Sequence, residues 1–160
     1  MHLALSMEEN PDLPDDPRER FRGYGVMGLP FASGHVLAFR RMVASSLGPG
    51  YTAVWHRDPA SRWTMYVDVD PRRACPRYFG RALDRVVEGP IELEWQDQQS
   101  LSLRIPRARF EWGLRLGSDS GTRAMNAMGR LLPSWLLRNQ VVLTALGLVA
   151  GRALGLGRLA

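Results

Sequence analysis

The sequence predicts a mainly β protein, an antiparallel barrel or sandwich followed by a C-terminal helical segment. Three observations support this prediction. Between residues 34 and 117, apolar and polar residues alternate in short runs, which is the period of a strand with one buried face. Gly, Pro, Asp and Ser separate these runs, as expected for turns. After residue 119 the apolar residues change to helical spacing.

Composition indicates one ordinary domain and limits its partners. The chain has 160 residues and a formal net charge of +5. All 21 basic residues are arginines, so the positive charge reflects a bias of the whole chain rather than a local phosphate-binding surface. We therefore expect no nucleic-acid partner. The single cysteine, Cys75, excludes an internal disulfide, and the first residues lack a signal-peptide pattern, so we expect a cytoplasmic location.

Residues 1–20 are predicted to form a disordered acidic leader. The stretch MEENPDLPDDPRER contains three prolines and few apolar residues, so it has too little apolar surface to fold. The segment GYGVMG, residues 23–28, then matches the dinucleotide-binding pattern G-x-G-x-x-G. No apolar strand precedes it and no helix follows it, so we interpret it as a flexible glycine turn.

Six strands are expected in the β domain, which we place at residues 21–118. The connections 58–61, 96–100 and 106–109 are short and have turn composition, so the strands on either side of each are expected to pair antiparallel. Residues 71–83 predict a turn or a short helical connection interrupted by a proline. The expected strands are residues 34–45, 51–55, 63–69, 91–96, 101–105 and 110–116.

Residues 119–160 predict a helical, apolar and basic tail. From residue 120 onward this tail contains five arginines and no acidic residue. Its longest uncharged run, residues 139–151, is too short to span a bilayer as a helix, and Arg152 interrupts it. We favour burial of the tail against protein, with peripheral membrane contact through residues 135–160 as the alternative.

Four of the five tryptophans fall on the apolar faces of separate predicted strands. Such a concentration either fills a sandwich core or lines a cavity whose rings give an apolar ligand its shape, and the sequence leaves both open. If a cavity is present, the expected ligand-binding residues are Phe39, Trp55, Trp63, Tyr66, Trp95 and Trp112.

Three segments, RWTMYVDVDPRRA, GPIELEWQDQQSLSLRI and RFEWGLRL, resemble hydroxyneurosporene synthase and carotenoid 1,2-hydratase-like proteins in strand spacing and tryptophan placement. The resemblance covers residues 34–117 and implies a lipocalin-like antiparallel barrel or sandwich. Proteins of this group are generally longer, so it also implies that the fold is incomplete here and is completed by a missing C-terminal half or by a second copy in a homo-oligomer. Residues 23–59 are also similar to bacterial proteins to which we assign no activity.

The resemblance implies hydration or cyclisation of a lipophilic polyene, in which an acid protonates a double bond, aromatic faces stabilise the cation and water attacks. The candidate catalytic residues are His35, Asp68 and Asp70. We favour His35 because it shares an apolar-rich face, and a hydrogen-bonded core histidine is the competing interpretation. Asp68 and Asp70 could hold a metal or share a proton on one strand face, but we favour a solvated strand end and expect no metal or cofactor.

We therefore expect the protein to bind an apolar small molecule, such as a lipid, a polyene or a terpenoid, in an aromatic-lined cavity. Hydratase or cyclase chemistry is an additional prediction that the resemblance alone supplies. The alternative is a non-catalytic structural or interaction protein whose basic apolar tail docks on a membrane surface or a partner chain.

Overall fold

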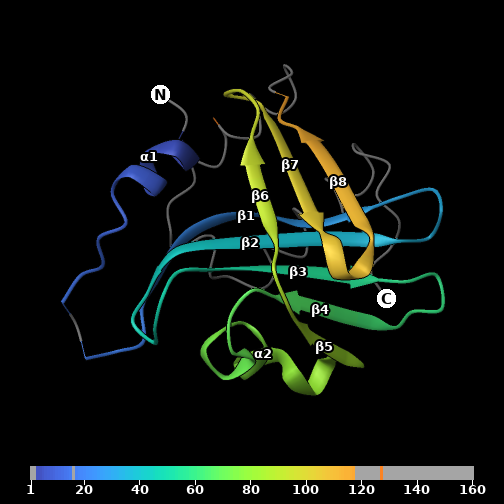
Figure 1. Cartoon of the computed structure of the whole chain (residues 1–160), viewed down its shortest axis with the longest axis horizontal. Coiled ribbons are helices and arrows are strands. Elements are labelled where there is room, and N and C mark those ends of the chain that lie inside the picture. The colour runs from blue at the N-terminus through green and yellow to red at the C-terminus, as the bar shows by residue number, and fades with distance from the viewer. Residues whose placement is uncertain (1–2, 16, 118–126, 128–160) are drawn as a thin grey trace. The chain divides into compact units, whose positions relative to one another are not determined.

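Eight strands in two sheets, with short helical segments, make up the described part of the chain (Figure 1). The computed structural model describes residues 3–15, 17–117 and 127. The chain divides into two units, Met1–Leu116 and Gly117–Ala160, and every strand of these two sheets belongs to the first. The prediction of a mainly β fold is confirmed for this part of the chain.

The larger sheet contains five strands in the order β1-β2-β3-β4-β5. The first four pair antiparallel with their neighbours, and β5 pairs parallel to β4. The predicted hairpin at residues 51–69 is confirmed as β3 and β4, and three short helical segments confirm the predicted connection at 71–83. The strands are β1 (Phe21–Pro30), β2 (Val36–Ser45), β3 (Tyr51–Arg57), β4 (Trp63–Val67) and β5 (Arg85–Glu88), and the helical segments are η1 (Pro71–Arg73), α2 (Pro76–Phe79) and η2 (Gly80–Ala82).

The smaller sheet is the predicted meander, with three antiparallel strands in the order β6-β7-β8. Its central strand shows the expected alternation, because Leu101, Leu103 and Ile105 are buried whereas the residues between them are not. Figure 1 shows these three strands lying across the strands of the larger sheet. The strands are β6 (Glu92–Trp95), β7 (Ser100–Ile105) and β8 (Phe110–Arg115), with a single 3-10 turn, η3 (Pro106–Ala108), between the last two.

Of the two predicted alternatives, a barrel or a sandwich, the barrel is wrong, because no strand pairing joins the two sheets within the described residues. Two strands were also not predicted. Strand β5 is four residues long, with charged residues at both ends, and its partner β4 is parallel, so no short hairpin turn signals it. Strand β1 contains the glycine motif of residues 23–28, which was interpreted as a flexible turn.

The larger sheet is buried on both faces. On one face, residues of β2 and β3 pack against the smaller sheet in what we call the inter-sheet core. On the other face, residues of β3 and β4 pack against the 71–83 connection in what we call the connector core. The inter-sheet core comprises the buried residues Leu37, Phe39, Val54, Leu101, Leu103, Ile105 and Trp112, and the connector core comprises Tyr51, Ala53, Met65, Val67, Ala74 and Cys75.

Glycines in β1 allow this strand to approach β2 closely. A Cβ atom on Gly25 would lie 2.2 Å from the carbonyl oxygen of Phe39, and one on Gly23 would lie 2.0 Å from that of Arg41. Both distances are shorter than any van der Waals contact, so only glycine fits at these two positions. The spacing that resembles a dinucleotide-binding motif therefore serves strand pairing.

The N-terminal leader differs from the expectation of a disordered segment. Residues Leu3–Glu9 form helix α1, and its residue Ala4 is buried. The glutamate at position 8 makes an ion pair with Arg41 of β2. Long-range contacts of this kind stabilise a segment whose composition alone gives no reason to fold.

Replacing Gly25 by alanine tests the close approach of β1 to β2. We expect Gly25→Ala to lower the free energy of unfolding by about 1–3 kcal/mol, because the added Cβ forces the two strands apart. Urea unfolding followed by circular dichroism measures this change. The matched control is Gly113→Ala in β8, where no atom lies within 4 Å of the added Cβ, and a change between about 0 and 1 kcal/mol in the stabilising direction is expected. Equal destabilisation by both substitutions would contradict the steric explanation.

Candidate functional site

A polar row and an apolar row of side chains lie next to each other on the face of the larger sheet that meets the smaller one. Positions two apart along a strand share a face, so residues paired across β2, β3 and β4 form rows perpendicular to the strands. The apolar row is part of the inter-sheet core or packs against it. The polar row is Arg41, Thr52 and Asp68, and the apolar row is Phe39, Val54 and Tyr66.

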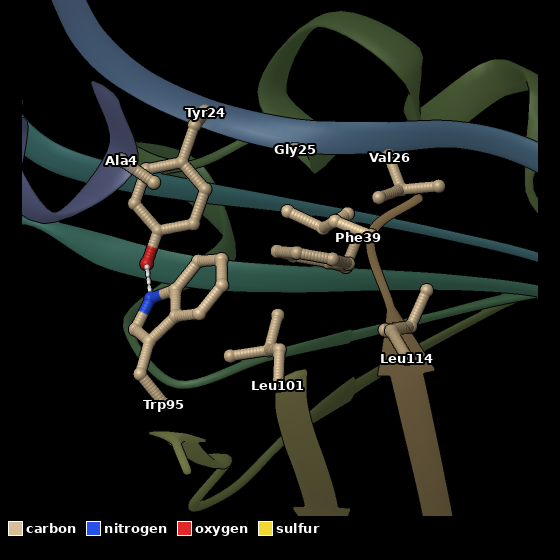
Figure 2. Close-up of a pocket in the computed structure, with 9 residues that line it drawn as sticks. Ala4, Tyr24, Gly25, Val26, Phe39, Trp95, Leu101 and Leu114 are labelled. Atoms are coloured by element: carbon tan, nitrogen blue, oxygen red, sulfur yellow. Dashed lines mark hydrogen bonds between the residues drawn. The ribbon is translucent and has the colours of Figure 1, made fainter. Parts of the chain in front are cut away.

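An apolar cavity of about 170 Å³ lies between the two sheets beside the apolar row (Figure 2). Figure 2 shows the rings of Tyr24 and Trp95 side by side at one end, with Ala4 of α1 next to Tyr24. Strands β1 and β2 form one wall of this cavity, and β6, β7 and β8 form the other. The lining residues are Ala4, Tyr24, Gly25, Val26, Phe39, Trp95, Leu101, Leu114 and Leu116.

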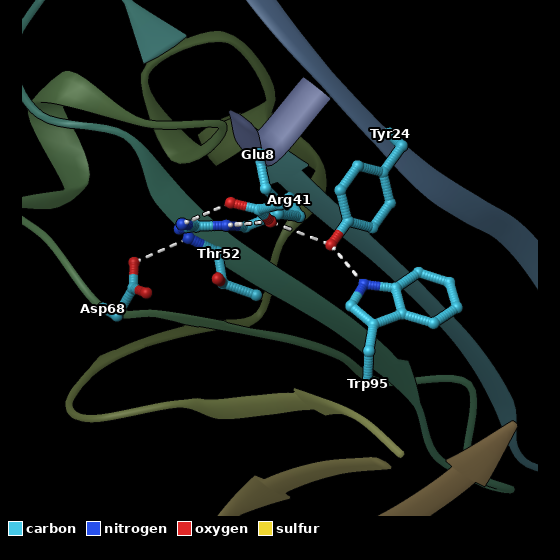
Figure 3. Close-up of polar contacts among 6 residues, drawn as sticks. All are labelled: Glu8, Tyr24, Arg41, Thr52, Asp68 and Trp95. Carbon is cyan, nitrogen blue, oxygen red and sulfur yellow. Dashed lines mark hydrogen bonds and ion pairs between the residues drawn. The ribbon is translucent and has the colours of Figure 1, made fainter. Parts of the chain in front are cut away.

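A second cavity, of about 280 Å³, lies over the polar row (Figure 3). Trp95 lines both cavities, so each of them borders on this residue. The combined site is therefore amphipathic, with an apolar end between the sheets and a charged end over β2, β3 and the residue after β4. The residues that line the polar cavity are Glu8, Arg41, Thr52, Asp68, Ile91, Leu93 and Trp95.

A chain of hydrogen bonds runs along the boundary between the two cavities (Figure 3). The indole N–H of Trp95 donates to the hydroxyl oxygen of Tyr24 at 3.0 Å, and this hydroxyl donates to Oε1 of Glu8 at 2.9 Å. Arg41 donates to the same carboxylate from Nε at 3.1 Å and from its second terminal nitrogen at 3.2 Å. One carboxylate thus accepts three hydrogen bonds, and two of them form the parallel pair by which arginine recognises carboxylates.

The two side chains that donate to Glu8 keep their protons at neutral pH. Burial is the main cause that raises the pKa of Tyr24 to about 12, so its hydroxyl keeps its proton. The hydrogen bonds that Arg41 donates to Glu8 raise the pKa of Arg41, so its guanidinium stays charged. The neutral phenol and the charged guanidinium are therefore both hydrogen-bond donors to the carboxylate.

Asp68 is a half-buried acid at the edge of the polar cavity. Its Oδ1 accepts the backbone N–H of Thr52 at 2.7 Å. Burial raises the pKa of Asp68, and this effect outweighs the opposing effects of the Thr52 hydrogen bond and the nearby Arg41 charge. Asp68 is the only one of the predicted catalytic residues that lines either of these two cavities.

Asp70 does not share a site with Asp68. Its carboxylate accepts the backbone N–H of Arg72 at 2.9 Å and thereby caps η1. It also pairs with the Arg72 guanidinium, and these hydrogen bonds lower the pKa of Asp70. The two carboxylates have different partners, and their pKa values move in opposite directions.

His35 lines neither cavity, although the sequence favoured it as the acid. It lies just before β2, and its Nδ1 is 2.8 Å from Nε2 of His56, with the two rings stacked at 5.0 Å between centroids. Burial, together with the neighbouring His35, lowers the pKa of His56. The competing interpretation of His35 as a hydrogen-bonded histidine agrees with this geometry.

The six aromatic residues predicted to line one cavity are divided between the two faces of the larger sheet. Phe39 and Trp95 line the apolar cavity. Tyr66 and Trp112 belong to the inter-sheet core or pack against it, with the Trp112 ring at 6.0 Å from Phe39 in a T-shaped arrangement. Trp55 and Trp63 are on the opposite face, where their rings meet edge to face at 6.1 Å.

Sequence reasoning missed Glu8, Tyr24, Arg41 and Thr52. One signal was present for Arg41, because it follows Leu37 and Phe39 at a spacing of two and so interrupts the apolar face of β2 with a charge. A charge in that position requires a partner. Tyr24 was hidden within the glycine motif. Glu8, the partner of Arg41, lies 33 residues before Arg41 in the sequence, and periodicity carries no information over such a separation.

Comparisons with protein-family models, with curated proteins and with solved structures give no match for this chain. The resemblance to hydroxyneurosporene synthase-like proteins therefore stays a prediction. Within the described residues, no group of three or more potential metal ligands comes together, and no helix has the length and apolar composition needed to cross a bilayer. The tail predicted at 119–160, with its proposed membrane contact at 135–160, lies outside the described residues apart from Ala127.

Asp68→Asn tests whether burial or the Arg41 charge has the larger effect on how ionised Asp68 changes the stability of the fold. A raised pKa means that ionised Asp68 destabilises the fold above pH 3.8, and this cost decreases as the pH falls and the group protonates. The D68N variant should therefore unfold at a higher urea concentration than wild type at pH 7, with a smaller difference near pH 4.

The matched control for this substitution is Asp70→Asn, whose carboxyl has a lowered pKa. Ionised Asp70 stabilises the fold above pH 3.8, and this contribution is lost as the pH falls through its folded pKa. D70N should accordingly lower stability at pH 7. A D68N protein that is less stable than wild type at pH 7 would show that the Thr52 hydrogen bond and the Arg41 charge together outweigh burial.

The stacked histidines predict an unusual titration. His56 should titrate below its ordinary pKa of 6.5, as measured from the pH dependence of its ring proton resonances by NMR. His35→Ala should raise the pKa of His56 toward 6.5, because it removes the part of the burial and the electrostatic effect that the neighbouring ring contributes. An unchanged His56 pKa in this variant would exclude electrostatic coupling between the two rings.

Proposed function

We propose that this protein binds a small lipophilic molecule with a polar end group in the space between its two sheets. The apolar cavity walled by both sheets is the observation that carries this proposal. Its volume of about 170 Å³ is similar to that of an apolar cavity of about 150 Å³ that accommodates benzene. The cavity therefore has room for a ring or a short chain rather than for a whole carotenoid.

The adjoining polar cavity gives the ligand an orientation. A ligand whose apolar part lies between Phe39 and Leu101 has its other end near Trp95, which lines both cavities. Apolar walls with a few placed polar groups are typical of small-molecule sites, in which burial supplies affinity and the polar groups supply specificity. Short lipids and monoterpenoids have both the size and the polarity that this site requires.

The same arrangement assigns the acid for any hydration or cyclisation. Among the predicted acids, Asp68 alone lines a cavity, and its raised pKa favours the protonated form that such a reaction needs. We propose binding as the function, and Asp68 as the proton donor where the bound molecule carries a reactive double bond.

Ligand binding is tested by titrating the ¹⁵N-labelled protein with 1-octanol and following the tryptophan indole N–H signals by NMR. The Trp95 signal should shift, because Trp95 lines both cavities. The signals of Trp55, which packs against the connector core, and of Trp63, whose ring meets that of Trp55, should not shift. The shifts of the latter two signals are an internal control for nonspecific effects of the alcohol.

Two matched substitutions locate the ligand. Leu114→Phe fills the apolar cavity and should weaken octanol binding by about tenfold or more, which corresponds to about 1.4 kcal/mol. Leu83→Phe makes the same change against the connector core and should leave the affinity unchanged. If octanol shifts all indole signals alike, or if both substitutions weaken binding equally, the cavity between the sheets is not the site.

A further inference from the structure

The polar cavity already holds a carboxylate, and that carboxylate belongs to the N-terminal helix. Glu8 of α1 accepts two hydrogen bonds from Arg41 and one from Tyr24. All three donors act on the same group, which is the arrangement expected of a carboxylate-binding site rather than of an incidental surface ion pair. The pair is only partly shielded, since the Arg41 and Glu8 side chains are 27% and 31% exposed.

The same helix also closes the apolar cavity. Ala4, one turn before Glu8, is 5% exposed and lines the space between the sheets. Helix α1 thus contributes a small apolar side chain to one cavity and a carboxylate to the other, in the same relative order as the apolar chain and head group of a short carboxylic acid. Figure 2 shows Ala4 next to the Tyr24 ring, and Figure 3 shows the Glu8 carboxylate at the Tyr24 hydroxyl.

The helix is suited to leave this position. It has seven residues, and a helix of that length is marginal on its own, so its place depends on the contacts that it makes. The ion pair with Arg41 and the Tyr24 hydrogen bond are two of those contacts. A ligand that supplies a replacement carboxylate can therefore take them over.

We propose that Glu8 occupies the place of a ligand carboxylate, so that the bound molecule is a monocarboxylic acid with a short apolar chain and α1 is displaced when it binds. This inference rests on the proposed binding of a lipophilic molecule between the sheets. It adds the chemical class of the head group and the segment that competes with it.

Charge balance favours a carboxylate over other head groups. The charged residues that line the polar cavity are Glu8, Arg41 and Asp68. Exchange of the Glu8 carboxylate for that of a ligand leaves the charge facing Arg41 unchanged. A neutral head group would leave Arg41 without this carboxylate, and a doubly charged phosphate would meet the carboxyl of Asp68.

The experiment compares sodium octanoate with 1-octanol, which have the same chain length, by NMR titration of the Trp95 indole signal at pH 7. Glu8→Gln removes the internal competitor, so its octanoate affinity should exceed that of wild type by about tenfold, while its octanol affinity changes far less. The matched control, Glu9→Gln, makes the same charge change at the exposed neighbouring position and should leave both affinities at the wild-type value.

Substitutions of Arg41 test whether this residue binds the head group of the ligand. Arg41→Gln should reduce octanoate affinity to that of octanol or below it, and Arg41→Lys, which keeps the charge but loses the paired donors, should give an intermediate value. The Trp55 and Trp63 signals report whether each variant stays folded. The lysine variant keeps the test valid if the glutamine variant unfolds.

The outcomes separate this inference from the proposed function. If octanol binds but Glu8→Gln raises the affinities for octanol and octanoate equally, α1 is a cover without a head-group site, and the carboxylate proposal is overturned while the proposed function stands. Octanoate affinity that is independent of Arg41 overturns it as well. If neither compound shifts the Trp95 signal in any variant, both proposals fail.

Discussion

The five-stranded sheet has to be covered on both faces, and the remaining features of the structure follow from this constraint. Its central strand β3 begins with four consecutive buried residues, 51–54, so neither face of the sheet can be left to solvent. The connection between β4 and β5 covers one face, and the three-stranded sheet covers the other. Three short strands are not enough to cover five, and α1 contributes to the cover beside β1 and β2.

The cavities lie where the cover changes from one element to another. The smaller sheet packs closely over the middle of the larger one, where Leu103 and Val54 are fully buried. Near Tyr24 and Arg41 the larger sheet is covered by α1 instead. The packing there leaves the apolar cavity and the polar cavity. A helix of seven residues is marginal on its own, so this part of the cover depends on its tertiary contacts.

Period-two alternation was sufficient to predict which residues of a strand share a face, but not which layer that face contacts. Trp55 shares its face of β3 with Ala53, as predicted, yet that face packs on the connector rather than on the smaller sheet. A sheet that is buried on both faces gives the same apolar signal for either side. The pairing of Glu8 with Arg41 and the parallel alignment of β5 depend on tertiary contacts, which a local pattern does not contain. Asp68 and Trp95 were predicted as site residues because they fall within the predicted strands 63–69 and 91–96.

The partly buried charges of the polar row lower the stability of the fold. Residues that lower stability are candidates for a role in function. Two carboxyl groups and a guanidinium lie partly buried beside an apolar cavity, and the raised pKa of Asp68 shows that burial disfavours at least one of these charges. Apolar residues of similar size would often pack as well or better in such a place. The sheet does not need these charges to form, since the neighbouring row of Phe39, Val54 and Tyr66 pairs in the same register without them. A charged row beside an apolar cavity is the arrangement that the proposed recognition of a molecule with one apolar and one charged end requires.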